Sequence, residues 1–232
     1  FPAWCRTYLG HYFRTDFAPF HLRLMETLNE PGLPTFVDIF RGAGKSCIDS
    51  LADPLYRTLQ HMRKYFLYGA IVQGLAVDLM DFVRIELENN SRIRADYGDI
   101  RVDGSEQEFV VETPGRRQTV KFEAFGIGMS PRGRRHGPDR PDAFVGDDLE
   151  DAMLARSQRR EQQLWDWLMD DVVPALEPKL WTFTVSGTMY GPGCMMERAR
   201  AKAQETDTSG RPLVKLFMQP ATEQGRSVWP AR

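Results

Sequence analysis

The amino-acid sequence predicts an α/β protein in which a mostly parallel central sheet carries helices on both faces. Segments rich in β-forming residues alternate with segments of helical periodicity along nearly the whole chain. The 232 residues, 42% of them hydrophobic, are enough to bury one large core. No internal repeat or low-complexity tract interrupts the alternation. A parallel sheet with crossover helices accommodates such an alternation.

The first third of the chain is expected to contain a helical segment and two strand–helix units. Residues 1–34 form the helical segment, since apolar residues recur there at helical spacing before a Pro-Gly pair. A strand follows over 35–40 (TFVDIF), and a helix should begin near Ser46, with Pro54 ending or kinking it. The second unit begins with a strand over 65–72 and continues into an amphipathic helix.

The remainder of the chain repeats this rhythm less regularly. Further strands are expected over residues 109–112, 119–125, 143–146, 180–185 and 213–218, and further helices over 154–170 and 194–204. The segment from Gly126 to Pro141 is too polar and too rich in chain-breaking residues for regular structure. We expect it to be a long loop.

Charge and composition exclude several classes of protein. The 30 basic and 32 acidic residues nearly balance, so the chain lacks the strongly basic surface of a protein that coats nucleic acid. No stretch approaches the roughly 20 apolar residues of a membrane span. The three cysteines share no metal-ligand spacing, which favours free thiols over a zinc site. We therefore expect a soluble intracellular protein without a membrane partner.

The motif Gly42-Ala43-Gly44-Lys45-Ser46 lies between a predicted strand and a predicted helix, the context of a phosphate-binding loop. Backbone N–H groups and the helix N-terminus attract phosphate oxygens, Lys45 reaches the β- and γ-phosphates, and the Ser46 hydroxyl binds Mg²⁺. The match to GxxxxGK[ST] is incomplete, because Ile39 occupies the position of the first glycine. The alternative is a chance glycine-rich turn before a helix. The predicted nucleotide-binding residues are Arg41, Gly42, Ala43, Gly44, Lys45, Ser46 and Cys47, and the predicted cofactors are ATP and Mg²⁺.

A second motif, about 100 residues downstream, supports this interpretation. An apolar strand over 143–146 ends in Asp147, which is placed to hold the Mg²⁺ of the bound nucleotide. Asp148 and Glu150 are both candidates for the carboxylate that orients and deprotonates the attacking water. The choice stays open, with Glu150 favoured because its longer side chain reaches past the metal. The alternative for this acidic cluster is a solvated helix start.

Several segments, in chain order, resemble the ATPase domain of the large terminase subunit of tailed bacteriophages. They are DFAPFH (16–21), FRGAGKS (40–46), SPRGRR (130–135), RPDAFVGDDLED (140–151), TVSGT (184–188) and VWPAR (228–232). Terminases often lack the first glycine of the loop and carry an arginine at the position of Arg41. The resemblance implies a P-loop NTPase of the additional-strand (ASCE, RecA-like) type. It places the ATPase domain over 1–225 and, over 226–232, the start of a linker to a nuclease domain, so this chain is not expected to cut DNA.

The resemblance also assigns roles to residues outside the two motifs. Phe20 and His21 would lie on the adenine side, although glutamine is commoner at the position of His21. If the strand order is that of additional-strand ATPases, the strand over 180–185 lies beside the acidic one. Ser186, Gly187 and Thr188 would then couple loss of the γ-phosphate to the rest of the domain. An ordinary aromatic cluster and an ordinary turn are the respective alternatives.

Arginines are candidates for stabilising charge on the transferred phosphoryl group. Arg41 would act within its own subunit. Arg132 resembles the arginine that terminases offer to a neighbouring subunit, although further arginines in residues 130–140 make that assignment ambiguous. The loop that carries them is more typical of a contact between subunits than of base readout.

The function implied by the resemblance is that of an ATP-hydrolysing motor that drives double-stranded DNA into the procapsid through the portal. The expected partners are phage DNA, the portal protein, the small terminase subunit and further copies of the chain in a ring, with a monomer in solution. The expected place is the host cytoplasm, transiently on the procapsid portal and outside the mature virion. Alternatives are a helicase-like or repair ATPase on the same fold and a nucleotide-binding scaffold without turnover.

Overall fold

The computed structural model describes residues 1–115 and 118–229, and it confirms the predicted fold class. Its main sheet has the strand order β3-β4-β5-β2-β6-β7-β1-β8. Every neighbouring pair from β5 to β8 is parallel, and the two pairs that include β4 are antiparallel. The strands are β1 (Pro34–Ile39), β2 (Tyr65–Ala70), β3 (Arg101–Gly104), β4 (Glu108–Glu112), β5 (Val120–Gly126), β6 (Ala143–Asp147), β7 (Thr182–Gly187) and β8 (Lys215–Gln219), followed by the hairpin of β9 (Thr222–Glu223) and β10 (Arg226–Ser227).

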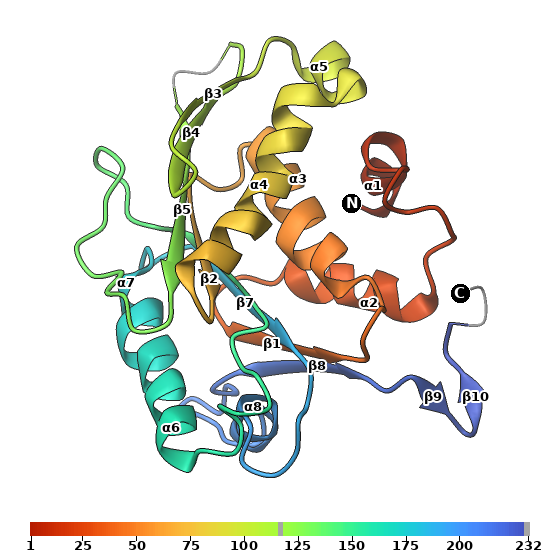
Figure 1. Ribbon diagram of the computed structural model, residues 1–232, viewed down its shortest axis with the longest axis vertical. Helices are drawn as coiled ribbons and strands as arrows, with labels where there is room; N and C mark the ends of the chain where they lie inside the picture. Colours follow the sequence, from red (N-terminus) through yellow and green to blue (C-terminus); the bar gives the residue numbers. More distant parts are fainter. Residues whose placement is uncertain (116–117, 230–232) are drawn as a thin grey trace.

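Helices cover both faces of this sheet, as Figure 1 shows. They are α1 (Pro2–Tyr8), α2 (Pro19–Leu28), α3 (Asp53–Leu59), α4 (Gln73–Asn89), α5 (Ser91–Tyr97), α6 (Gln158–Asp166), α7 (Val173–Ala175) and α8 (Met195–Lys202), with π-helical turns η1 (Cys47–Ala52) and η2 (Trp167–Val172). The helices α1 to α5 share one apolar cluster with the sheet, and α6 and α8 share the other. Among the described residues, no helix is long and apolar enough to cross a membrane.

The order of the central strands determines which predicted site residues lie close together. Strand β7 lies between β1 and β6, so that Ser186 aligns with Val37 on one side and with Asp147 on the other. Because these three strands are parallel, their carboxyl ends meet at one edge of the sheet. The predicted neighbourhood of the strand over 180–185 and the acidic strand is thereby confirmed, although β7 begins and ends two residues later than expected.

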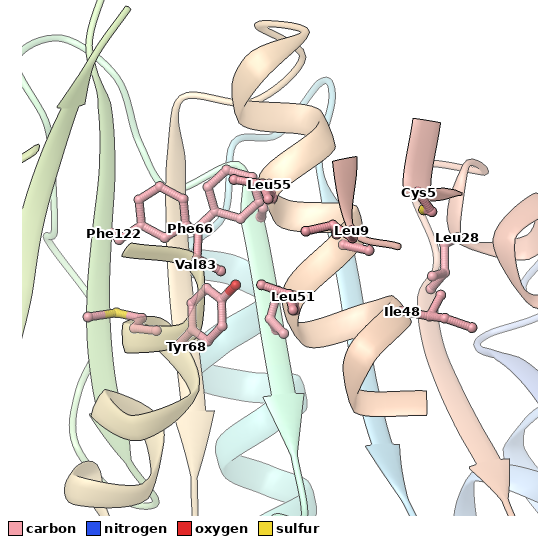
Figure 2. Packing of buried hydrophobic residues seen from close by; sticks show 14 of the residues in the cluster. Cys5, Leu9, Leu28, Ile48, Leu51, Leu55, Phe66, Tyr68, Val83 and Phe122 are labelled. Atoms are coloured by element: carbon pink, nitrogen blue, oxygen red, sulfur yellow. The ribbon is translucent and has the colours of Figure 1, made fainter. Parts of the chain in front are cut away.

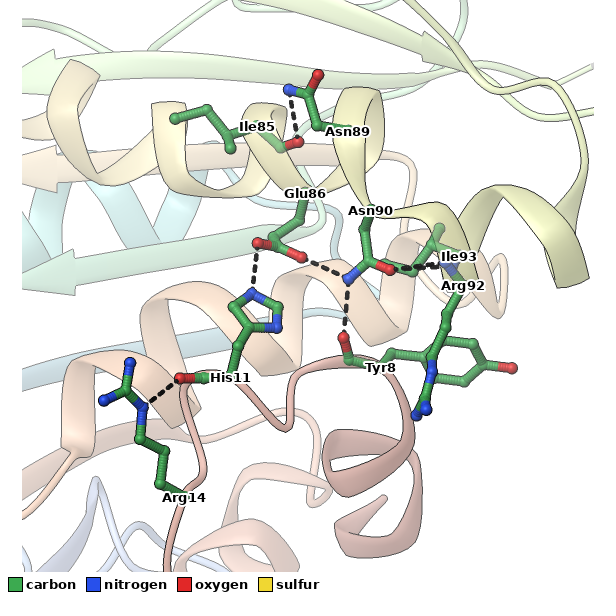
Figure 3. A network of polar contacts seen from close by, with 9 residues as sticks. All are labelled: Tyr8, His11, Arg14, Ile85, Glu86, Asn89, Asn90, Arg92 and Ile93. Carbon is green, nitrogen blue, oxygen red and sulfur yellow. Dashed lines mark hydrogen bonds and ion pairs between the residues drawn. The ribbon is translucent and has the colours of Figure 1, made fainter.

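The N-terminal segment is anchored to the helical layer by a buried carboxylate (Figure 3). Glu86 of α4 is buried and accepts hydrogen bonds from His11 Nε2 at 2.9 Å and from Asn90 Nδ2 at 2.6 Å. Asn90 also donates to the Tyr8 carbonyl at 2.8 Å, and its Oδ1 accepts from two backbone N–H groups at the start of α5. One side chain thus caps a helix and holds the N-terminal segment against it. The predicted helical segment is two helices, α1 and α2, with this connection between them.

Two predicted helices differ in their bounds for identifiable reasons. Pro54 does not end the helix after the phosphate loop, because η1 precedes α3 and its wider hydrogen-bonding pattern accommodates a proline that has no N–H. The helix expected over 154–170 begins instead at Gln158. Before it, Asp151 Oδ1 accepts from the N–H groups of Met153 at 2.9 Å and Leu154 at 2.7 Å, which stabilises turns in place of helix. Of the predicted linker over 226–232, the last three residues lie outside the described part of the chain.

Buried aromatic side chains pack against both faces of the sheet around β2. Figure 2 shows Phe66 and Phe122 packed against Tyr68 and Val83, and the rings of Phe66 and Phe122 stack with centroids 4.8 Å apart. On the same strand β2, a Cβ added to Gly69 would lie 2.7 Å from a ring carbon of Phe144 on the other face. A buried aromatic ring cannot move aside without disturbing its own neighbours.

The substitution Gly69→Ala is therefore expected to destabilise the fold by about 1–3 kcal/mol through overpacking. Urea denaturation followed by circular dichroism measures this change. Gly74→Ala in α4 is the matched control, because nothing lies within 4 Å of its added Cβ. The control should stay within about 1 kcal/mol of the wild type. Equal stability of the two variants would contradict the packing described here.

Candidate active site

The phosphate loop connects β1 to η1 and takes its shape from two glycines. Gly42 and Gly44 have φ angles of 76° and 78°, the left-handed region that residues with a Cβ rarely adopt. A Cβ on Gly44 would meet nothing within 4 Å, so the loop faces open space at that point. The site of the predicted phosphate contacts is thus a backbone concavity at a helix N-terminus.

The side chain of Lys45 bridges this loop to the end of β7. Its Nζ donates to the Gly187 carbonyl at 3.1 Å and to Thr188 Oγ1 at 3.2 Å. The ammonium also lies 3.9 Å from Asp148 Oδ1, and the side chain is only 10% exposed. The Lys45 ammonium therefore contacts three other predicted site residues, which lie in the acidic turn and at the end of β7.

Asp147 and Ser46 complete this cluster. The Ser46 hydroxyl lies close enough to the Asp147 carboxylate to lower the pKa of that group. Burial raises the pKa of Asp147 to about 6, repulsion from Asp148 adds to the shift, and Ser46 and Lys45 oppose it. Asp147 Oδ1 has no hydrogen-bond partner among the described residues. A serine hydroxyl beside a carboxylate oxygen that lacks a partner is the oxygen donor set that suits Mg²⁺, so these residues fit the predicted metal.

The two candidate carboxylates for water activation point to different places. Asp148 is exposed and lies beside Lys45, on a backbone with a φ angle of 43° that is held by a hydrogen bond from its N–H to the Ser186 carbonyl at 3.0 Å. Glu150 is buried, and its Oε2 accepts from the Met195 N–H at the start of α8 at 3.0 Å. The structure thus brings Asp148, and not Glu150, into contact with Lys45.

The environment of Glu150 has a measurable consequence for stability. Burial raises the pKa of Glu150 from 4.5 to about 7, and the N–H of Met195 opposes the shift. The folded state therefore holds an extra proton between pH 4.5 and 7, so its stability falls as pH rises through that range. Without nucleotide, Glu150→Gln should be more stable than the wild type by about 1–3 kcal/mol at pH 8 and similar to it at pH 4.5.

Urea denaturation at both pH values tests this expectation. Glu106→Gln is the control, because Glu106 is exposed in the connection between β3 and β4. This control should follow the wild type at both values. A difference between Glu150→Gln and the wild type that does not change with pH would contradict the assignment.

The predicted coupling residues lie at the end of β7. Ser186 and Gly187 are buried, and Thr188 is half-buried. The Ser186 hydroxyl donates to Asp49, a residue of η1. A Cβ on Gly187 would lie 2.8 Å from a methionine methyl of α8. Burial raises the pKa of Asp49 well above its ordinary value, and nearby Asp147 adds to the shift.

On the other side of the loop, His21 supports the backbone. Its Nδ1 accepts from the Ala18 N–H at 3.0 Å, so Nε2 carries the hydrogen and donates to the Ala43 carbonyl at 2.7 Å. A small cleft beside it is lined by residues that include Tyr12, Phe17, Cys47 and Trp229. The predicted adenine side therefore has an aromatic cleft next to the loop. Phe20 lies in the core and does not line this cleft.

The two predicted arginines occupy separate positions. Arg41 Nη2 donates to the Tyr190 hydroxyl at 3.2 Å, and the guanidinium lies 6.0 Å from the centre of that ring. Arg41 thereby contacts the segment that follows β7. Arg132 forms an ion pair with Asp171 at 2.5 Å and donates to the Asp170 carbonyl at 3.0 Å. These contacts attach Arg132 to η2 and not to the phosphate loop of its own chain.

Sequence reasoning missed two contributors to the site. Asp49 lies four residues after Lys45, on the face of the helix that returns to β7. Its acidic character within an otherwise apolar helix start was the available signal. Tyr12 lines the cleft from a loop with no recognisable motif, so nothing in the sequence pointed to it.

Neither a protein-family model nor a curated protein sequence matches this chain. Solved structures do. The large terminase ATPase domain of Thermus phage P74-26 aligns with a TM-score of 0.61 and 13% identity, over 96% of this chain and 87% of that one. A single-residue variant of the same domain gives a TM-score of 0.62 and 12% identity with the same coverage. The chain therefore has the fold of these domains, and the resemblance that its motifs indicate is confirmed at the level of the fold.

Proposed function

We propose, from a fold shared with the ATPase domain of a phage large terminase, that this chain is a Mg²⁺-dependent ATPase that drives DNA packaging. One observation carries the proposal. Lys45 and Ser46 of the phosphate loop, the acidic turn after β6 and the end of β7 converge at one edge of the sheet. A fold alone does not establish an activity, whereas this combination of groups is suited to phosphoryl transfer.

Each group has a proposed role that its contacts support. Lys45 and the N–H groups of the loop would bind the β- and γ-phosphates, and Ser46 and Asp147 would hold the metal. Mg²⁺, when bound, neutralises charge on the phosphate oxygens. Asp148 is the better placed candidate to orient and deprotonate water, because it already contacts the lysine that binds the γ-phosphate. Glu150 would then act by holding α8 against the acidic turn.

The remaining parts of the proposal concern assembly. Arg41 would stabilise the transferred phosphoryl group within the chain, and Arg132, which lies away from its own phosphate loop, would serve the site of a neighbouring copy in a ring. The partners would be double-stranded DNA, the portal protein and the small terminase subunit, with the ring docked on the procapsid portal in the host cytoplasm. The near-neutral chain favours local DNA contacts over a continuous basic surface.

Two assays test the proposal in sequence. The first measures phosphate release from ATP with and without Mg²⁺ and double-stranded DNA. The second measures protection of DNA from nuclease after incubation with purified empty procapsids that carry portals. Metal-dependent turnover together with protected DNA is the expected result. Absence of turnover would overturn the enzymatic function, and RNA-stimulated turnover with strand separation would replace the packaging motor by a helicase.

A further inference from the structure

Asp49 is a buried carboxylate without a role in the predicted phosphate or metal contacts. It is 1% exposed, and burying a carboxylate costs free energy unless its oxygens are hydrogen-bonded. Its partners are two hydroxyls: Ser186 donates to Oδ2, and Ser50 donates to Oδ1 at 3.1 Å. Asp53, the next acid on the same helical stretch, instead forms an ion pair with Arg57 at 2.6 Å. Two neutral hydroxyls therefore hold Asp49, whereas a charged guanidinium holds Asp53.

The bond to Ser186 joins two elements at the site. Asp49 lies one turn beyond Lys45 in η1, a π-helical turn of a kind that occurs often at functional sites. Ser186 lies near the end of β7, and its carbonyl accepts from the Asp148 N–H. One serine thus connects the helix after the phosphate loop, through its hydroxyl, and the acidic turn, through its carbonyl.

The residues that follow Ser186 are held differently. Gly187 and Thr188 both accept from the ammonium of Lys45. Lys45 gives two of its three N–H donors to Gly187 and Thr188, so binding both the β- and the γ-phosphate would redirect at least one of these donors to phosphate oxygens. The segment from Gly187 onward would then be held less firmly, while Ser186 kept its bond to Asp49. The boundary between a fixed and a released part of β7 would lie between Ser186 and Gly187.

We infer that Asp49 is a positioning residue of the ATPase site. It fixes Ser186 to the phosphate-loop helix, so that only the segment from Gly187 onward is released when Lys45 moves its hydrogen bonds to the phosphates. This inference rests on the proposed function and deepens it. Asp49 is not one of the predicted phosphate or metal contacts. It acts through Ser186 and keeps Asp148 in register with the phosphate loop.

The test compares Asp49→Ala, which removes both acceptor oxygens, Ser186→Ala and the double variant with the wild type. ATP turnover gives kcat and KM, fluorescence of a labelled nucleotide gives Kd, and thermal denaturation gives the folded fraction. We expect each single variant to lower kcat about 10–100-fold, since a small displacement of a reacting group has effects of that size. Kd should change less than about threefold. The double variant should be no slower than the worse single one, because both remove one link.

Two controls separate positioning from stability. Ser50→Ala removes the other hydroxyl on the same carboxylate and should leave kcat within about threefold of the wild type. Asp53→Asn weakens a neighbouring buried pair and should lower the melting temperature without lowering kcat per folded molecule.

Hydrogen exchange supplies a second readout. In the wild type, Mg²⁺ and a non-hydrolysable ATP analogue should speed exchange from Gly187 onward and not before it, whereas in Asp49→Ala the change should spread toward the start of β7. A wild-type chain that neither binds nor hydrolyses ATP would overturn the proposed function. An active wild type with unchanged kcat in Asp49→Ala and Ser186→Ala would overturn the inference alone.

Discussion

Replacing Lys45 with alanine should remove nearly all ATP turnover, lowering kcat/KM by about 10²–10³-fold or more, the usual effect of losing one charged donor at a developing phosphate charge. Lys45 contacts both the acidic turn and the end of β7. The same substitution leaves Gly187 and Thr188 without their side-chain donor, so nucleotide affinity should fall together with turnover.

The measurement is phosphate release across a range of ATP concentrations, with binding of a labelled nucleotide in parallel. Lys179→Ala is the matched control, because Lys179 is exposed and precedes β7, at the opposite end of the strand from the site. This variant should retain wild-type turnover. Retained turnover in Lys45→Ala would mean that the convergence of the three segments serves some other purpose.

The second large effect should come from Asp148. Asp148→Asn keeps the size of the side chain but removes the base beside Lys45, so kcat should fall by about 10²–10⁴-fold. Binding should be nearly unchanged, because the phosphate and metal contacts come from other residues. Single-turnover hydrolysis and labelled-nucleotide binding distinguish the two quantities.

Glu150→Gln is the informative comparison. Its amide oxygen retains the bond from the Met195 N–H, so α8 stays in place while the acidic group is lost. If Asp148 is the base, Glu150→Gln should retain turnover within about tenfold of the wild type. A larger loss of turnover in Glu150→Gln than in Asp148→Asn would instead indicate Glu150 as the catalytic carboxylate, as its longer side chain predicts.

The sequence predicted much of the architecture because its signals were local. The strand before the phosphate loop, the glycines at 42 and 44 and the apolar strand that ends in Asp147 each follow from a few consecutive residues. Long-range features were harder to predict. The direction of Glu150 depends on where the N-terminus of α8 lies, and the partner of Asp49 lies 137 residues away in the chain. Boundaries such as the late start of α6 depended on one competing side chain, Asp151, whose turn bonds outweigh helical periodicity.

The insertion of β7 between β1 and β6 also determines when the site can exist during synthesis. The phosphate loop and the acidic turn leave the ribosome first, but the strands before them, β1 and β6, do not pair with each other. The strand that joins them, β7, ends at Gly187. In a nascent chain shorter than this, β1 lacks both of its strand partners, one edge of β6 is open, and the proposed nucleotide site is incomplete. Folding must therefore close a loop of well over 100 residues before the proposed nucleotide site can form, a topology that slows folding.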